Sequence, residues 1–235
     1  MTTNTIIGLV ASYVYAFGLI VVAETLHRVW NVSQDLTRKL VHVGAGMWVF
    51  GVLALFDRWQ WGILPFATFI VANYMFHRYR VFKAMDAEQS TLGTVYFALA
   101  ITVLFSLLWR PQGPVDHAPI AVAGTMALTW GDAAAALVGQ NVGRHQYRVW
   151  GSQRSWEGSA ALVVVAAVAI FLTLALLPGS WLSPHAPLVG TRTALLAAAL
   201  GAGTAALVEA LSPHGTDNLS VPFAAAAVVL LVVGV

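Results

Sequence analysis

Residues 118–139 read APIAVAGTMALTWGDAAAALVG and contain one ionisable side chain, Asp132. A bilayer is crossed by about 20 consecutive apolar residues, so this stretch is long enough to span. Lipid cannot hydrogen-bond to the backbone, which restricts a spanning segment to a helix or a closed barrel. The apolar residues run continuously and do not alternate with polar ones, which favours the helix.

The rest of the chain has the same character. It is 59% hydrophobic and 9% charged, and a soluble domain would need far more charge to cover its surface. We therefore predict an all-α, polytopic transmembrane bundle, a single membrane domain over residues 1–235. The expected helices cover 5–26, 40–56, 60–77, 93–109, 118–139, 158–178, 190–211 and 218–235. These give about eight spans, or seven if the glycines and proline of the last two segments interrupt one of them.

The basic residues predict the orientation, because cytoplasmic loops are enriched in Lys and Arg. One set of alternate connections carries nine of the twelve basic residues: Arg28, Arg38, Lys39, Arg78, Arg80, Lys83, Arg144, Arg148 and Arg154. The other set carries Arg58, Arg110 and Arg192. The richer side is expected to be cytoplasmic and both termini non-cytoplasmic, in the inner or plasma membrane of a bacterium or archaeon. Most acidic residues fall on the richer side too, so we look for chemistry there.

Two polar groups lie within or at the inner end of the predicted spans. Asp132 lies seven residues inside its expected helix, about 10 Å deep, where a carboxylate needs a partner or a wet cavity. A structural ion pair with a buried arginine is the alternative to a functional role. Arg38 and Lys39 share a helix face with His42. That trio is a candidate polyanion contact, or else a topogenic basic anchor.

The connection from Gly139 to Ser159 combines glycines with cations. Gly139 and Gly143 would let backbone amides approach an anion, and Arg144 and Arg154 would face phosphates. Ser155 is placed to cap the next helix, whose positive dipole end favours anions. In the same segment Glu157 is a candidate ligand for a hard cation. An ordinary capped loop remains the alternative.

Two further clusters lie near the same side. Glu209 ends a long apolar helix, and Asp217 and Asn218 follow within a polar turn that carries no Lys or Arg. Together they offer oxygen ligands to a metal ion, or else they form only a tight turn and a helix cap. The segment from Ser90 to Thr94 is a helix cap or a phosphate contact.

Several motifs are absent from the sequence. It has no cysteine, no Walker-type phosphate loop, no zinc-protease motif and no serine elbow. Its net charge of +2 gives no reason to expect a nucleic-acid partner. Cations, glycines and carboxylates converging on one membrane face indicate phosphoryl or nucleotidyl transfer, in which positioning and charge neutralisation do most of the catalysis.

The arrangement resembles the CTP-dependent polyprenol kinases, a family that includes phytol, farnesol and dolichol kinases. Five motifs carry the resemblance, in the family's order and over nearly the whole chain. They are Arg38-Lys39-x-x-His42, Ser90-x-x-Gly93-Thr94, Gly131-Asp132-x-x-Ala135 with Gly139 and Gly143, Ser155-x-Glu157-Gly158-Ser159, and Glu209 with Asp217-Asn218. The compact length is similar to that of the phytol and farnesol kinases.

The resemblance implies transfer of the γ-phosphate of CTP to an isoprenoid alcohol, with Mg²⁺. Catalytic roles then fall to Asp132, Glu157 and His42. Metal ligands would come from Asp132, Glu157, Glu209, Asp217 and Asn218. Nucleotide or phosphate contacts would come from Arg38, Lys39, Thr94, Gly139, Gly143, Arg144, Arg154 and Ser155. The family usually has lysine where this chain has Arg154, which keeps the charge but changes the geometry.

Two other functions stay open at this point. A CDP-lipid synthase would also use CTP, and the turn at 212–218 resembles its signature loosely. A small transporter could use Asp132 as a proton or ion site. The near absence of polar groups in the outer half of the spans argues against the transporter, because a transport pathway needs polar groups toward both faces.

Overall fold

A computed structural model describes residues 2–79, 92–150, 152–213 and 215–234. These residues form eight helices and one antiparallel hairpin. The helices are α1 (Thr3–Trp30), α2 (Gln34–Leu55), α3 (Trp59–Tyr79), α4 (Gly93–Leu108), α5 (Ala118–Val142), α6 (Trp156–Leu176), α7 (Thr191–Leu211) and α8 (Asp217–Val233). The hairpin strands are β1 (Gln146–Val149) and β2 (Ser152–Ser155). The predicted helical segments are each present, with ends shifted by a few residues.

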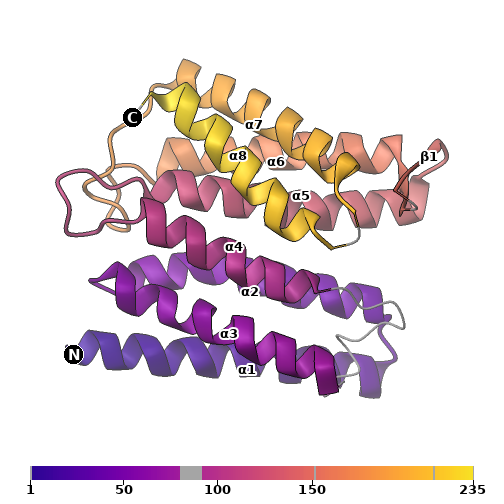
Figure 1. Ribbon diagram of the computed structural model, residues 1–235, viewed down its shortest axis with the longest axis horizontal. Coiled ribbons are helices and arrows are strands. Elements are labelled where there is room, and N and C mark those ends of the chain that lie inside the picture. The colour runs from indigo at the N-terminus through magenta and orange to yellow at the C-terminus, as the bar shows by residue number, and fades with distance from the viewer. Residues whose placement is uncertain (1, 80–91, 151, 214, 235) are drawn as a thin grey trace.

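The helices run alongside one another between two ends of the molecule (Figure 1). α1 begins and α8 ends at the same end, and the hairpin lies at the opposite end, which we call the hairpin end. Five helices are long and apolar enough to cross a membrane, namely α1, α2, α5, α6 and α7. α4 and α8 are apolar but shorter. Composition and helices together indicate a multi-pass membrane protein.

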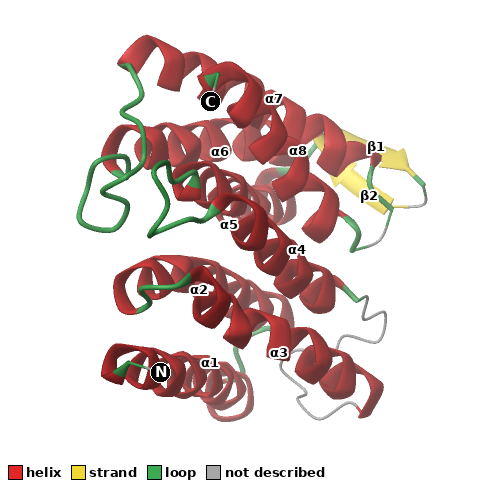
Figure 2. Cartoon of the chain, turned by 60° about the vertical axis from the view of Figure 1, so that its left-hand side comes forward, coloured by secondary structure: helices red, strands yellow, loops and turns green. Residues whose placement is uncertain are grey.

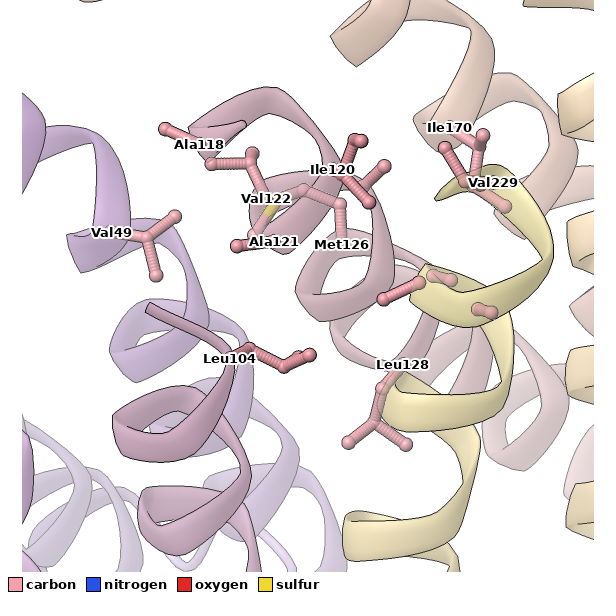
Figure 3. Packing of buried hydrophobic residues seen from close by; sticks show 14 of the residues in the cluster. Val49, Leu104, Ala118, Ile120, Ala121, Val122, Met126, Leu128, Ile170 and Val229 are labelled. Atoms are coloured by element: carbon pink, nitrogen blue, oxygen red, sulfur yellow. The ribbon is translucent and has the colours of Figure 1, made fainter. Parts of the chain in front are cut away.

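α5 is the centre of the bundle. All residues from Ala118 to Thr129 are buried, as expected of a helix that is apolar on every side. Figure 3 shows Ile120, Val122 and Met126 from this helix facing the neighbouring helices. The core reaches from Val49 on α2 to Val229 on α8. α5 is therefore held on several sides, and this rigid setting fixes the position of Asp132.

Small residues let the helices approach closely. A Cβ atom added to Gly124 on α5 would lie 2.5 Å from the carbonyl oxygen of Pro222 and 2.8 Å from Ala226 Cβ on α8. Both are closer than packed atoms tolerate, and the backbone oxygen cannot swing away. Gly203 on α7 is the opposite case, since nothing lies within 4 Å of its added Cβ.

We therefore expect Gly124→Ala to lower the free energy of unfolding by about 1–3 kcal/mol, the usual cost of overpacking. Gly203→Ala is the matched control and should change it by less than about 1 kcal/mol, in the stabilising direction. Denaturant unfolding in detergent measures both. Equal effects at the two positions would contradict close packing of α5 against α8.

The connection between α5 and α6 was predicted to be a loop, but it contains the β1–β2 hairpin. Tyr147 pairs with Arg154 and Arg148 with Gln153 across the two strands. Trp150 takes a left-handed backbone conformation at the turn, with φ of 51°. Figure 2 shows the strands near α7 and α8, and Arg154 of β2 contacts the last turn of α7 and the first turn of α8. The alternating side chains of a hairpin send Arg154 to one face and Gln153 to the other.

Candidate active site

A cavity of about 330 Å³ opens among α1, α2, α3 and α4, and also touches α5 and the start of α8. Its part nearer the hairpin end is polar and is lined by Arg38, Lys39, His42, Asn73, His77, Thr94, Asp132, Asp217 and Asn218. Its deeper part is apolar and largely aromatic, lined by Tyr15, Leu19, Ile20, Trp48, Phe66, Phe69, Phe97 and Ile101. The cavity is therefore amphipathic along the direction of the helices.

Asp132 lies at the boundary between these two parts. Lys39 Nζ donates to Asp132 Oδ2 at 2.5 Å, and His42 Nε2 lies 3.7 Å from the same oxygen. The His42 ring packs against Phe97, with ring centroids 4.4 Å apart. Within the described part of the chain, His42 Nε2 has no hydrogen-bond partner. The three polar groups predicted separately on α2 and α5 thus meet at one point.

The depth of Asp132 explains why it needs these partners. It lies ten residues before the last residue of α5, Val142, which corresponds to about 15 Å along the helix. A carboxylate this far inside a membrane helix is stabilised by a cation and by water in a cavity. The partner is Lys39, whereas the alternative drawn from the sequence was a buried arginine.

Asp217 and Asn218, at the start of α8, also line the polar part of the cavity. They form the first turn of α8. Asp217 Oδ1 accepts hydrogen bonds from the Asn218 backbone at 2.9 Å and from its Nδ2 at 3.1 Å. Asp217 Oδ2 lies 3.8 Å from Arg154 Nη2. Carboxylates from α5 and α8, far apart in the sequence, therefore face the same space.

Arg154 and Glu209 form an ion pair with each other. Arg154 Nη1 contacts Glu209 Oε1, and the two side chains are 13% and 10% exposed. Arg154 Nη2 also donates to the Ser212 carbonyl at 3.3 Å. This network ties β2 to the α7–α8 turn. Neither residue lines the cavity, so this arrangement does not place Arg154 as a phosphate clamp or Glu209 as a metal ligand.

Glu157 also lies apart from the cavity. Its carboxylate accepts from His145 Nδ1 at 2.6 Å and from the His145 backbone amide at 3.2 Å. His145 is exposed and Glu157 partly exposed, at the start of α6 beside the hairpin, and neither lines the cavity. The catalytic and metal-binding roles expected of Glu157 stay predictions, and this location does not support them.

Gly139, Gly143 and Ser155 pack α5 against α6. Ser155 caps α6 as predicted, accepting from the Gly158 amide at 3.0 Å. A Cβ on Gly143 would lie 2.7 Å from Ser155 Oγ, and one on Gly158 of α6 would lie 2.8 Å from the Ala135 carbonyl oxygen of α5. The close approach of these helices accounts for the glycines without a bound phosphate.

The remaining predicted contacts divide between the cavity and the surface. Arg38 lines the cavity, is 43% exposed and lies 4.0 Å from Asp35. Thr94 lines it as well, and its carbonyl accepts from Asn73 Nδ2 at 3.1 Å. Arg144 is exposed next to the hairpin. Ser90 and Thr91 lie outside the described residues.

The five predicted metal ligands do not form one centre. No three histidine or acidic side chains in the described part of the chain are grouped closely enough to hold a metal ion. Asp132 and Asp217 nevertheless face one cavity, with Asn218 beside them. Mg²⁺ that arrives on a nucleotide takes most of its ligands from phosphates and water and needs only one or two carboxylates. This donor set fits such an ion.

The aromatic part of the cavity was missed by sequence reasoning. Its residues come from four helices and look like any other apolar helix contact. A partial signal was present on α2, where Lys39, His42, Ala45 and Trp48 recur every third residue, so that each is a neighbour of the next on the helix surface. Following this row of neighbours from the polar residues would have pointed to Trp48.

These features define a multi-pass helical membrane protein with an amphipathic cavity. The apolar part of this cavity, which we call the apolar chamber, meets the polar part at the cluster of Lys39, His42 and Asp132. The chain is 31% identical to the phytol kinase of Synechocystis sp., over 94% of this chain and 88% of that protein. It is 26% identical to a probable chloroplastic phytol kinase of Triticum aestivum, over 93% of this chain and 74% of that one. A probable chloroplastic phytol kinase 2 of Oryza sativa subsp. japonica is 28% identical, over 81% and 64% of the two chains.

The chain belongs to the phytol kinase family, because the identity to the Synechocystis protein extends over nearly its whole length. No protein-family model matches it, and no solved structure matches it.

Proposed function

We propose that this protein is a membrane-embedded kinase that transfers the γ-phosphate of CTP to the hydroxyl of an isoprenoid alcohol such as phytol. Membership of the phytol kinase family supports the alcohol, and the resemblance of the motifs to CTP-dependent kinases supports the donor. The proposed reaction takes place at the cytoplasmic face.

The observation that carries the proposal is the amphipathic cavity. Ligand pockets are mostly apolar with a few placed polar groups, and an isoprenoid alcohol has the same division, with one hydroxyl on a long apolar tail. The tail would occupy the aromatic part between α1, α2, α3 and α4. The hydroxyl would then lie beside Asp132, where the polar part begins.

The chemistry follows from the groups at that boundary. The alcohol oxygen forms a bond to the γ-phosphorus, the bond from that phosphorus to the β-phosphate oxygen breaks, and CDP leaves. Asp132 accepts the hydroxyl proton, with His42 3.7 Å away as a second acceptor. Lys39 and Arg38 balance the phosphate charge, as positioned cations do in phosphoryl transfer. Asp217 and Asn218 would hold Mg²⁺ on the nucleotide, which neutralises charge on the β- and γ-phosphates.

The test is an incubation of membranes containing the protein with γ-labelled CTP, ATP, GTP or UTP and a set of lipid alcohols. We expect label in an isoprenoid monophosphate with CTP, with CDP as the second product. Release of pyrophosphate together with a CDP-lipid would indicate a synthase. Label in no lipid under any pairing would reject the kinase.

The proposed orientation can be tested by cysteine labelling, because the chain has no native cysteine. Gln146→Cys lies on the exposed hairpin, and Leu188→Cys is at the opposite end, where Leu188 is 82% exposed. In intact cells, a maleimide that cannot cross membranes should label Leu188→Cys alone. After the membrane is permeabilised it should label both. Labelling of Gln146→Cys in intact cells would contradict a cytoplasmic site.

A further inference from the structure

We propose that Trp48 forms the floor of the apolar chamber and sets the longest isoprenoid tail that the protein accepts. The inference rests on the proposed function in one respect, that the tail lies in this cavity. It adds the residue that determines which alcohols fit.

The first argument is the position of Trp48 on α2. Lys39, His42, Ala45 and Trp48 all line the cavity, and Trp48 is the deepest of the α2 residues that do. It lies six residues beyond His42, which is about 9 Å along the helix. A Cβ on Gly51 would lie 2.8 Å from the Trp48 ring. The indole therefore covers the next turn of α2, on the side away from the polar groups.

The second argument is that the indole is held in place. Trp48 Nε1 donates to Ser12 Oγ at 3.0 Å. The ring stacks on Tyr15, with centroids 4.3 Å apart and planes 17° apart, and the Tyr15 hydroxyl donates to the Gly44 carbonyl at 2.9 Å. Trp48 is partly buried, and its hydrogen bond and its stacked face together hold the ring in this position. The tail cannot push such a ring aside without breaking these contacts.

The third argument is that the space beyond Trp48 is filled. Val49 directly follows Trp48, Val52 lies one turn further along α2, and both are fully buried. A Cβ on Gly8 of α1 would lie 2.8 Å from Phe56, and one on Gly62 of α3 would lie 2.3 Å from Trp109. The four helices that enclose the chamber thus close against one another below the indole. A longer tail has no continuation of the cavity to enter.

Two substitutions on this face should shift the limit in opposite directions. Trp48→Ala removes the floor and should admit longer tails. Ala45→Phe adds a ring one turn nearer to His42 and should exclude tails that the unmodified protein accepts. Trp156→Ala is the matched control, because Trp156 is 66% exposed and lies outside the cavity.

The experiment uses the detergent-purified full chain and a series of isoprenoid alcohols that differ by one isoprene unit. Competition between two alcohols gives the ratio of kcat/KM for the longer over the shorter. Thermal stabilisation by the methyl ethers of the same alcohols, which cannot be phosphorylated, gives the longest tail that binds. We expect Trp48→Ala to raise the ratio at the length limit by at least about tenfold. Ala45→Phe should lower it by a similar factor, and Trp156→Ala should leave it unchanged.

The two readouts separate this inference from the proposed function. If the unmodified protein phosphorylates alcohols but neither cavity substitution moves the length limit, the inference is wrong and the kinase stands. If the ether-binding limit moves as expected but no nucleotide gives a lipid phosphate, the floor is supported and the kinase is wrong. Should Trp48→Ala not fold, the downward shift with Ala45→Phe decides, and an unchanged limit there overturns the inference.

Discussion

Asp132→Asn should lower kcat for alcohol phosphorylation by about 10²–10⁴-fold, the usual contribution of a positioned acid or base. The amide keeps the shape of the carboxylate and can still accept the hydrogen bond from Lys39. It can neither take the hydroxyl proton nor carry a negative charge next to a metal ion. Initial rates at saturating alcohol and nucleotide measure the effect. Asp57→Asn, the same change on an exposed residue in the connection between α2 and α3, is the control.

A structural ion pair would respond differently. If Asp132 only neutralises Lys39, a double variant that removes both charges, Lys39→Met with Asp132→Asn, should be about as active as Lys39→Met alone. A catalytic Asp132 predicts that the double variant is much less active than Lys39→Met alone while still inserting and folding. Full activity in the single variant would remove this carboxylate from the mechanism.

The convergence of Lys39, His42 and Asp132 could be predicted because each residue is conspicuous in its setting. Charges inside apolar helices are costly, so each demands a partner, and the shared helix face of Lys39 and His42 follows from spacing alone. The helical segments were predictable too, because continuous apolar runs mark them, and five of the eight helices in the described residues are long and apolar enough to cross a membrane.

The sequence could not show which carboxylate reaches the cavity. Asp217 and Glu157 both begin a helix near the hairpin end, and both were candidate metal ligands. Only their neighbours separate them, because His145 holds Glu157 at the surface while the α7–α8 turn carries Asp217 to the cavity. The hairpin was missed as well, since four-residue strands leave too short an alternation to distinguish from a polar loop.

The pairing of Arg154 with Glu209 depends on that hairpin, and it leads to the second large effect. Arg154→Ala should lower the free energy of unfolding by about 3–5 kcal/mol, the cost of leaving a buried charge without its partner. Glu209 is 8% exposed, and its carboxylate would face the gap left by the guanidinium. Thermal or denaturant unfolding in detergent gives the value. Arg148→Ala, on the exposed face of the neighbouring strand, is the matched control and should change little.

A phosphate clamp at Arg154 predicts another result, namely a raised KM for the nucleotide with stability unchanged. The double variant Arg154→Met with Glu209→Leu separates the two roles, because apolar replacement of a buried pair is often neutral for stability. If the pair is structural, the double variant regains most of the stability lost by Arg154→Ala. Its activity should return with it, since the α7–α8 turn again supports Asp217. If Arg154 binds phosphate, the double variant stays defective for the nucleotide however stable it becomes.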